Sequence, residues 1–174
     1  FLRYIDAKRF DGASIYRAVD MGRGYGLLQG GVKTVDKLFP PIAHEPTTKT
    51  GLTHNDGAIS MARQAEGTAR ADFFVTLGDM SGLDANPEAP GDNTGFAVFG
   101  HVVQGMDLVR KLVAGEIDPS KGGEFGMAGQ MLAKPVAIIS ARRAPDWQPP
   151  VEPAPVPAAE PEPAAETQAQ PSAS

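Results

Sequence analysis

Cysteine does not occur among the 174 residues, which excludes disulfides, thiolate nucleophiles and cysteine-ligated metals. The three histidines, His44, His54 and His101, have no paired metal-ligand spacing, and no Gly-x-Ser-x-Gly nucleophile motif is present. No apolar run approaches the roughly 20 residues that a membrane-spanning helix needs. The sequence therefore gives no sign of covalent or metal catalysis, and we expect neither a metal nor a cofactor.

Basic residues are missing from the last part of the chain. No Lys or Arg follows Arg143, whereas five acidic residues do, so this segment alone carries a formal charge of −5. The preceding residues hold 16 acidic and 16 basic side chains and are neutral as a whole. A neutral domain lacks the positive footprint of a nucleic-acid-binding protein, and it argues against a charged substrate as the main ligand.

The composition also divides the chain. Nine of the 16 prolines lie from Pro145 onward, with little to bury around them. Such a segment cannot offset its ordering entropy, so we expect one domain over residues 1–143 and a disordered Pro/Ala/Glu-rich tail over 144–174. The chain opens at Phe1 on a helical pattern without an N-cap, so we expect the natural N-terminus to be missing. The tail and the lack of cysteine favour a periplasmic over a cytoplasmic location.

The most informative stretch is 14–31, which predicts two short strands joined by a glycine-rich turn. A period of two places Arg17 on the same sheet face as Ile15 and Val19, and Gln29 on the apolar face of the second strand. These two polar side chains need partners, because burying an unpaired charge is costly. Two interpretations stay open from spacing alone: an edge-strand arginine in solvent, or a shallow apolar groove with one fixed cation and one amide.

The rest of the domain is predicted to be mainly β. Apolar or alternating runs predict strands over 57–62, 72–77, 96–103 and 135–141, and apolar residues at helical spacing predict one helix over 105–114. Short strands, few helices and long glycine-rich loops are typical of a closed β-barrel or a sandwich.

Blocks of sequence in a fixed order resemble the cyclophilin-type peptidyl-prolyl cis-trans isomerases. The resemblance covers about residues 1–143, and its blocks include Phe1-Leu-Arg-Tyr-Ile-Asp, Phe10-Asp-Gly-Ala-Ser-Ile-Tyr-Arg-Ala-Val, Leu28-Gln-Gly-Gly, Gly57-Ala-Ile-Ser-Met-Ala-Arg, Ala71-Asp-Phe-Phe-Val and Gly95-Phe-Ala-Val-Phe-Gly. It implies an eight-stranded antiparallel barrel with two helices, here without its first two strands. It also implies isomerisation of X–Pro bonds in unfolded or flexible protein segments, which assists protein folding.

Residue by residue, the resemblance assigns catalysis to Arg17 and Gln29. It places the substrate against nine residues that would line the groove and the proline pocket: Tyr16, Leu27, Met61, Ala62, Arg63, Asp72, Phe74, Leu83 and Phe96. The implied partners are proline-containing polypeptides, with weak binding of cyclosporin-like ligands, and the expected state is a monomer.

The sequence departs from the family pattern at five positions near this site. Tyr16 stands where well-known members have histidine, Gly26 where an aromatic is usual, Asp72 where glutamine is usual, Gly82 where tryptophan is usual, and Phe96 where histidine or tyrosine is usual. These departures imply weaker or altered binding in the proline pocket. They leave an alternative open, in which the chain is a catalytically weak module that binds proline peptides or acts as a chaperone.

Overall fold

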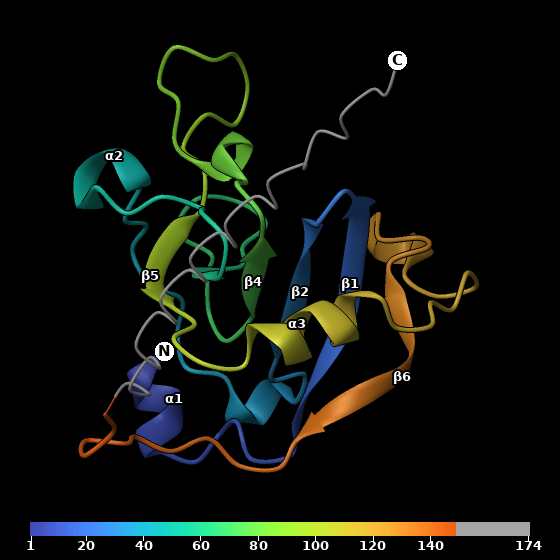
Figure 1. Cartoon of the computed structure of the whole chain (residues 1–174). Coiled ribbons are helices and arrows are strands. Elements are labelled where there is room, and N and C mark those ends of the chain that lie inside the picture. Colours follow the sequence, from blue (N-terminus) through green and yellow to red (C-terminus); the bar gives the residue numbers. More distant parts are fainter. Residues whose placement is uncertain (149–174) are drawn as a thin grey trace, which may run out of the picture.

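The computed structural model describes residues 1–148 and shows a mainly β domain (Figure 1). The strands are β1 (Ala13–Gly22), β2 (Tyr25–Gly31), β3 (Ala58–Met61), β4 (Phe73–Leu77), β5 (Ala97–His101) and β6 (Met131–Ile138). The helices are α1 (Leu2–Asp6), α2 (Thr47–Thr50) and α3 (Met106–Val113), with 3-10 turns at Val35–Lys37, Ser81–Leu83 and Gly123–Phe125.

The strands form one antiparallel sheet in the order β5-β3-β4-β2-β1-β6. The family resemblance implied eight strands less the first two, and the six strands and the mainly β architecture are confirmed. Within residues 1–148 no pairing joins the outer strands β5 and β6, so the hydrogen-bonded ladder has two ends. The last strand begins at Met131, earlier than the predicted start at Pro135. Proline is tolerated there because β6 is an edge strand.

One hydrophobic cluster lies under α3, which crosses the β1–β2 hairpin in Figure 1. The helix contributes apolar side chains at the predicted helical spacing, and the strands contribute the facing ones. The buried members are Ala18, Leu28, Leu77, Val113 and Leu132, with Met106, Val109 and Leu112 packed against them. The predicted helix over 105–114 is thus confirmed, and its apolar face covers one side of the sheet.

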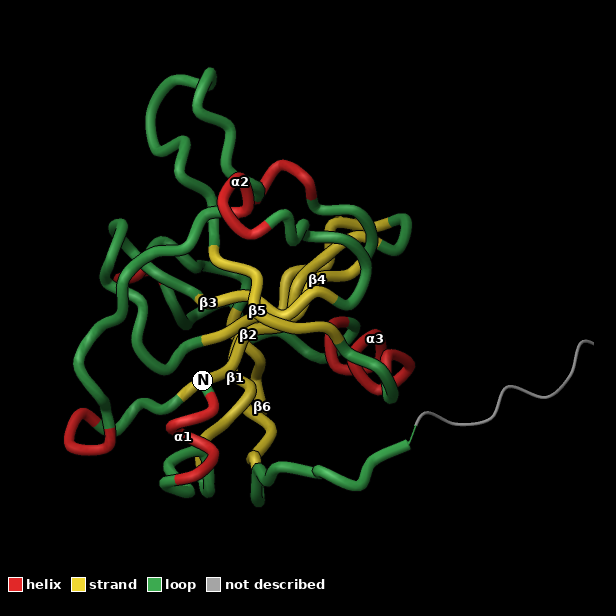
Figure 2. Tube along the Cα trace, turned by 90° about the vertical axis from the view of Figure 1, so that its left-hand side faces the viewer, coloured by secondary structure: helices red, strands yellow, loops and turns green. Residues whose placement is uncertain are grey.

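A second cluster is built around α1 and is rich in aromatic rings. Tyr4 and Phe10 are buried, and the Phe10 ring lies 4.9 Å from Phe1 and 5.7 Å from Phe73. The turned view in Figure 2 shows α1 and α3 on different sides of the strands. The sheet is therefore held between two apolar clusters that belong to different helices.

The prediction that Arg17 shares a sheet face with Ile15 is wrong, and a β-bulge is the reason, whereas Arg17 and Val19 do share a face as predicted. Ile15 pairs with Gly30 and Arg17 pairs with Gln29, so Tyr16 is an extra residue between two consecutive pairs. A bulge breaks the period of two, because two residues on one strand oppose one on the other. Ile15 consequently packs in the cluster under α3, while Tyr16 and Arg17 both reach Gln29.

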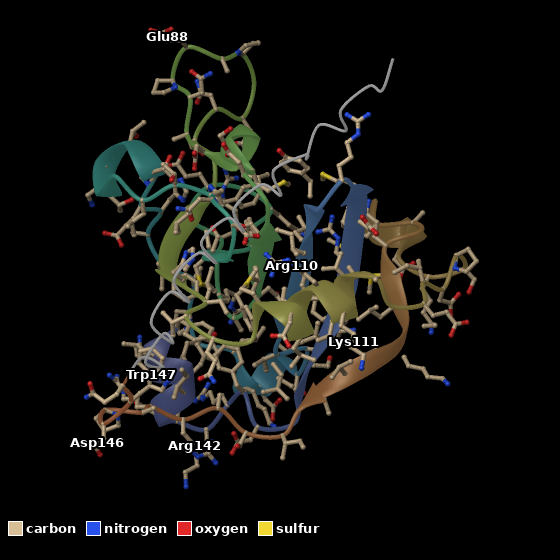
Figure 3. All side chains as sticks on the ribbon, in the orientation of Figure 1. Glu88, Arg110, Lys111, Arg142, Asp146 and Trp147 are labelled. Carbon is tan, nitrogen blue, oxygen red and sulfur yellow. The ribbon has the colours of Figure 1, made fainter. Side chains whose placement is uncertain are left out.

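After β6 the chain runs back past α1, where two arginine pairs hold it (Figure 3). Arg142 Nη1 lies 2.7 Å from Asp11 Oδ1, and Arg143 Nε lies 2.6 Å from Asp6 Oδ1. Most of the tail predicted to be disordered, 149–174, lies outside the described residues. No helix of the described part is both long and apolar enough to cross a membrane.

We expect Phe10→Ala to lower the free energy of unfolding by about 3–5 kcal/mol, because it leaves a cavity among packed rings. Phe10 is 1% exposed, whereas Ile139, the control position, is 88% exposed. Ile139→Ala should change the free energy by no more than about 0.5 kcal/mol. Urea denaturation measures both. Similar losses for the two variants would contradict the assigned core.

Candidate active site

A single row of paired residues crosses the sheet at the site. Arg17 pairs with Gln29, Gln29 with Phe74, Phe74 with Ser60, and Ser60 with Val98. Directly opposed residues on neighbouring strands project their side chains on the same face. The sheet register therefore brings Arg17, Gln29 and Phe74 side by side from three strands.

The Arg17 guanidinium is held by two amide side chains. Its Nη1 donates to Gln29 Oε1 at 2.6 Å, and its Nε and Nη2 donate to Gln130 Oε1 at 2.8 and 2.5 Å. Arginine carries five N–H donors, so two are left for another acceptor. The solvated-arginine interpretation is wrong, because this half-buried cation is fixed on two edges.

Sequence reasoning missed Gln130, which lies immediately before β6. It is separated from Arg17 by 113 positions, and no periodicity marks it. The only hint is its place in a glycine-rich connection, where a polar side chain is common. Gln130 reaches the guanidinium because the fold pairs Met131, the first residue of β6, with Arg17 in β1.

A chain of hydrogen bonds continues from Gln29 to a carboxylate. Gln29 Nε2 donates to the Tyr16 hydroxyl at 2.9 Å, and that hydroxyl donates to Asp72 Oδ1 at 2.9 Å. Gln29 and Tyr16 are 5% and 8% exposed. With Arg17 donating to the other end of the amide, both ends of the Gln29 side chain are fixed, and its orientation is set by partners on each side.

Burial shifts the pKa values of the ionisable groups in this series of hydrogen bonds. Burial and the nearby Asp72 carboxylate raise the pKa of the Tyr16 hydroxyl, which keeps it a neutral donor. Burial lowers the pKa of Arg17, but a guanidinium stays protonated in proteins. Burial also raises the pKa of Asp72, against the opposing effects of the Tyr16 hydroxyl and the Lys33 ammonium.

An aromatic cluster stands next to Gln29 along the same face. The rings of Phe74 and Phe96 meet edge to face with centroids 5.4 Å apart, and the Phe96 amide donates to the Leu83 carbonyl at 3.0 Å. The structure thus brings together three of the four residues predicted for the proline pocket; the fourth, Leu27, pairs with Thr76, two positions along β4 from Phe74. Phe74 is 4% exposed, while Leu83 and Phe96 are partly exposed.

His54 backs this cluster, and sequence reasoning missed it. Its ring stacks parallel to Phe74 at 5.8 Å, its Nδ1 lies 2.6 Å from Asp84 Oδ1, and its Nε2 lies 3.0 Å from Ser60 Oγ. The residue types are those of a serine-hydrolase triad, but His54 and Ser60 are both 0% exposed, so no substrate reaches the hydroxyl. Burial lowers the pKa of His54, and this group supports the pocket from behind.

Arg63 holds the loop that carries Phe96. Its Nη1 and Nη2 lie 2.7 and 2.9 Å from the two Asp92 carboxylate oxygens, and its Nε donates to the Gly95 carbonyl at 3.0 Å. The guanidinium also lies 5.0 Å from the Phe96 ring centroid. This pairing raises the pKa of Arg63 and lowers that of Asp92. Arg63 therefore fixes the position of the aromatic cluster.

A cavity of about 740 Å³ lies beside Gln29. It is lined in part by five of the predicted site residues, namely Tyr16, Gln29, Ala62, Arg63 and Asp72. The other predicted residues are not among its lining: Arg17, Leu27, Met61, Phe74, Leu83 and Phe96. Met61 and Leu27 are buried, at 4% and 9% exposed. The site thus has two parts, a broad cavity and an aromatic cluster, with Gln29 between them.

Two departures from the family pattern, Gly26 and Gly82, differ in whether the surrounding structure leaves room for a side chain. A Cβ atom at Gly26 would lie 2.3 Å from the Val19 carbonyl oxygen, so the close approach of β1 and β2 requires glycine there. A Cβ atom at Gly82 would meet nothing within 4 Å. Packing therefore does not require glycine at position 82, where the family usually has a large ring.

Fold and site together define a class: an antiparallel β protein with a fixed guanidinium beside a buried aromatic cluster. The sequence profile of the family described as cyclophilin type peptidyl-prolyl cis-trans isomerase/CLD matches residues 1–142. The chain belongs to this family, whose enzymes interconvert the cis and trans forms of peptide bonds preceding proline.

Individual relatives agree with this assignment. Peptidyl-prolyl cis-trans isomerase A of Dickeya dadantii is 30% identical over 146 residues, covering 82% of this chain and 70% of that protein. Peptidyl-prolyl cis-trans isomerase cyp18 of Streptomyces antibioticus is 29% identical over 147 residues, covering 82% and 81%. A Cryptosporidium parvum cyclophilin type isomerase, crystallised in the presence of the dipeptide Ala-Pro, shares the fold with a TM-score of 0.56 at 16% identity, covering 79% and 78%.

We expect Gln130→Ala to lower kcat/KM about 10- to 100-fold. The substitution removes two hydrogen bonds to the Arg17 cation, and one such bond is worth about 1.5–3 kcal/mol. A proline-peptide isomerisation assay measures the loss, with circular dichroism to check the fold. Gln104→Ala, at an exposed position, serves as the control. Unchanged activity of the Gln130 variant would show that Arg17 needs no support from β6.

We expect Asp72→Asn to raise the free energy of unfolding at pH 7. The raised pKa of Asp72 means that the folded state disfavours the carboxylate, so its ionisation costs stability above that pKa. The cost disappears as pH falls through the raised pKa toward the ordinary 3.8, so the advantage of the variant should shrink over that range. Urea titrations at several pH values measure it. A wild-type protein that is more stable at pH 7 would contradict this assignment.

Proposed function

We propose that this chain isomerises X–Pro bonds in flexible or unfolded protein segments, with Arg17 as the catalytic group. The observation that carries the proposal is the guanidinium fixed by Gln29 and Gln130, with Gln29 in β2 lying between it and Phe74 in β4. The structural relative was crystallised in the presence of Ala-Pro, and we assign the same ligand class to this site.

The reaction needs no nucleophile, metal or cofactor. Rotation about a peptide bond faces a barrier of about 18–20 kcal/mol, because resonance gives the bond partial double-bond character. X–Pro bonds populate both isomers but exchange slowly. A catalyst has only to bind the twisted bond more tightly than either planar form.

Arg17 supplies this preference through the two N–H groups that its amide partners leave unengaged. When the X–Pro bond twists, conjugation between its nitrogen and its carbonyl is lost. A hydrogen bond from the guanidinium draws the nitrogen lone pair out of resonance, so this bond is strongest in the twisted state. A donor already held in place costs no reorganisation when the bond twists. In this proposal Gln29 and Gln130 are positioning residues, and Tyr16 with Asp72 fixes Gln29 in turn.

The proline ring binds against Phe74, Leu83 and Phe96 in this proposal. Apolar rings favour the pyrrolidine ring and keep water from the bond. The substrate chain extends from there into the cavity lined by Ala62 and Asp72. Because Gly82 stands where the family usually has a large ring, we expect fewer contacts to the proline ring and therefore a high KM. Periplasmic location, a monomeric state and weak binding of cyclosporin-like ligands stay predictions from the sequence.

We expect Arg17→Ala to lower kcat/KM by roughly 100- to 1,000-fold while the fold is kept, as for the loss of a preorganised donor in other enzymes. Exchange spectroscopy on an X–Pro peptide separates turnover from binding. Arg110→Ala, at an exposed position of α3 (Figure 3), is the control. Equal turnover by the Arg17 variant would remove the mechanism. Binding without turnover by the wild type would favour the alternative of a proline-peptide binding module.

A further inference from the structure

The cavity beside Gln29 is lined by more positive than negative side chains. Its lining includes Lys33, Arg63 and Arg70 against one carboxylate, Asp72. Arg63 is paired with Asp92. Among residues 1–148, no carboxylate lies within ion-pair distance of the Lys33 ammonium or the Arg70 guanidinium. The domain is neutral as a whole, so this is a local excess of positive charge.

A second, smaller cavity of about 160 Å³ continues the positive surface. It shares Lys33 and Val32 with the first cavity and adds Arg9 and Lys37. Arg9 Nη1 donates to the Lys37 carbonyl oxygen at 2.8 Å, which keeps these two residues together. We name Arg9, Lys33, Lys37 and Arg70 the basic strip. It runs from the neighbourhood of α1 to the cavity at the site.

The chain itself contains a segment with complementary chemistry. Residues 149–174 include eight prolines and four glutamates but no Lys or Arg. Three of the glutamates, Glu152, Glu160 and Glu162, directly precede a proline. A Glu-Pro unit places a carboxylate next to a proline ring. It is therefore complementary to a proline-binding site flanked by cations that have no carboxylate partner.

The C-terminal part of the described chain packs on the same hydrophobic cluster as Val32, which lies at this surface. Ala141 packs against the cluster that contains Val32, and Val32 lines both cavities. The Arg142 and Arg143 ion pairs fix the chain just before its last described residues. From Gln148 onward, 26 residues at about 3.1 Å each reach roughly 80 Å. A domain of this size is roughly 40 Å across, so length does not limit contact.

We propose that segment 149–174 docks on the basic strip of its own chain and presents Glu-Pro units to the Arg17 site as a competing ligand. The proposal rests on the proposed function, because it takes the Arg17 site to be one that recognises proline. A tethered ligand has an effective concentration on the order of 1 mM. Even a weak ligand, with an intrinsic Kd of about 1 mM, then occupies half of the molecules and doubles the apparent KM for other substrates.

The kinetic test compares the full chain with a variant of neutral tail, in which Glu152, Glu160, Glu162 and Glu166 are replaced by glutamine. We expect the variant to have about a twofold lower KM for a proline peptide and an unchanged kcat. The difference should close in 1 M salt, where exposed charges are screened. The control carries four matched changes at exposed positions of the domain, namely E88Q, D107N, E116Q and E124Q, and should keep the wild-type KM.

An NMR test reports docking without reference to catalysis. Backbone amide shifts at Lys33, Ala62, Gln64 and Thr68 should differ between the native and the neutral tail. Lys33→Glu should abolish that difference, whereas Lys111→Glu, on the exposed face of α3 (Figure 3), should preserve it. If the shifts differ but the wild type does not isomerise, the proposed function fails and docking stands. If activity depends on Arg17 but the shifts are identical, docking fails and the function stands.

Two further outcomes would overturn the proposal. Shift differences that weaken on dilution of the protein would mean that the segment binds a second copy of the chain. An unchanged KM for the neutral-tail variant at low salt would mean that the segment does not compete for the site.

Discussion

The hydrogen bond between Arg17 and Gln29 across β1 and β2 is the interaction on which the site depends. It exists because the bulge at Tyr16 turns Arg17 away from the cluster under α3 and toward Gln29. Without the bulge, a regular strand would place Arg17 on the face of Ile15, where a guanidinium would meet apolar side chains at a high desolvation cost. The bulge at Tyr16 thus lets the Arg17 guanidinium be held by hydrogen bonds instead of being buried among apolar side chains.

The surrounding structure fixes this pair from two sides and supports the aromatic cluster separately. Gln130 fixes the far edge of the guanidinium, and the Tyr16–Asp72 hydrogen bond fixes the far end of the Gln29 amide. On the other side, Arg63 holds the loop that brings Phe96 against Phe74, and His54 contacts Asp84, next to Leu83. The Arg17 guanidinium and the aromatic cluster are therefore supported by separate networks that meet at the Gln29–Phe74 pair of the sheet.

Periodicity in the sequence predicted the parts of the fold that regular geometry determines. The strand at Phe73–Leu77 and the helix at Met106–Val113 were predictable because their apolar residues follow one period without interruption. The family resemblance pointed to Arg17, Gln29 and the aromatic cluster. The bulge was not predictable, since it is a property of register between strands. Neither were Gln130 and His54, because their partners lie far away in sequence and only the folded chain brings them together.

A double-mutant cycle on the isomerisation rate tests most directly whether the protein acts by holding one cation in place. The account predicts that Gln130→Ala lowers kcat/KM in the wild-type background and has no further effect once Arg17 is alanine, because the amide acts only through the guanidinium. Losses that add in full would contradict it. They would mean that Gln130 meets the substrate itself and that the guanidinium is not the group it serves.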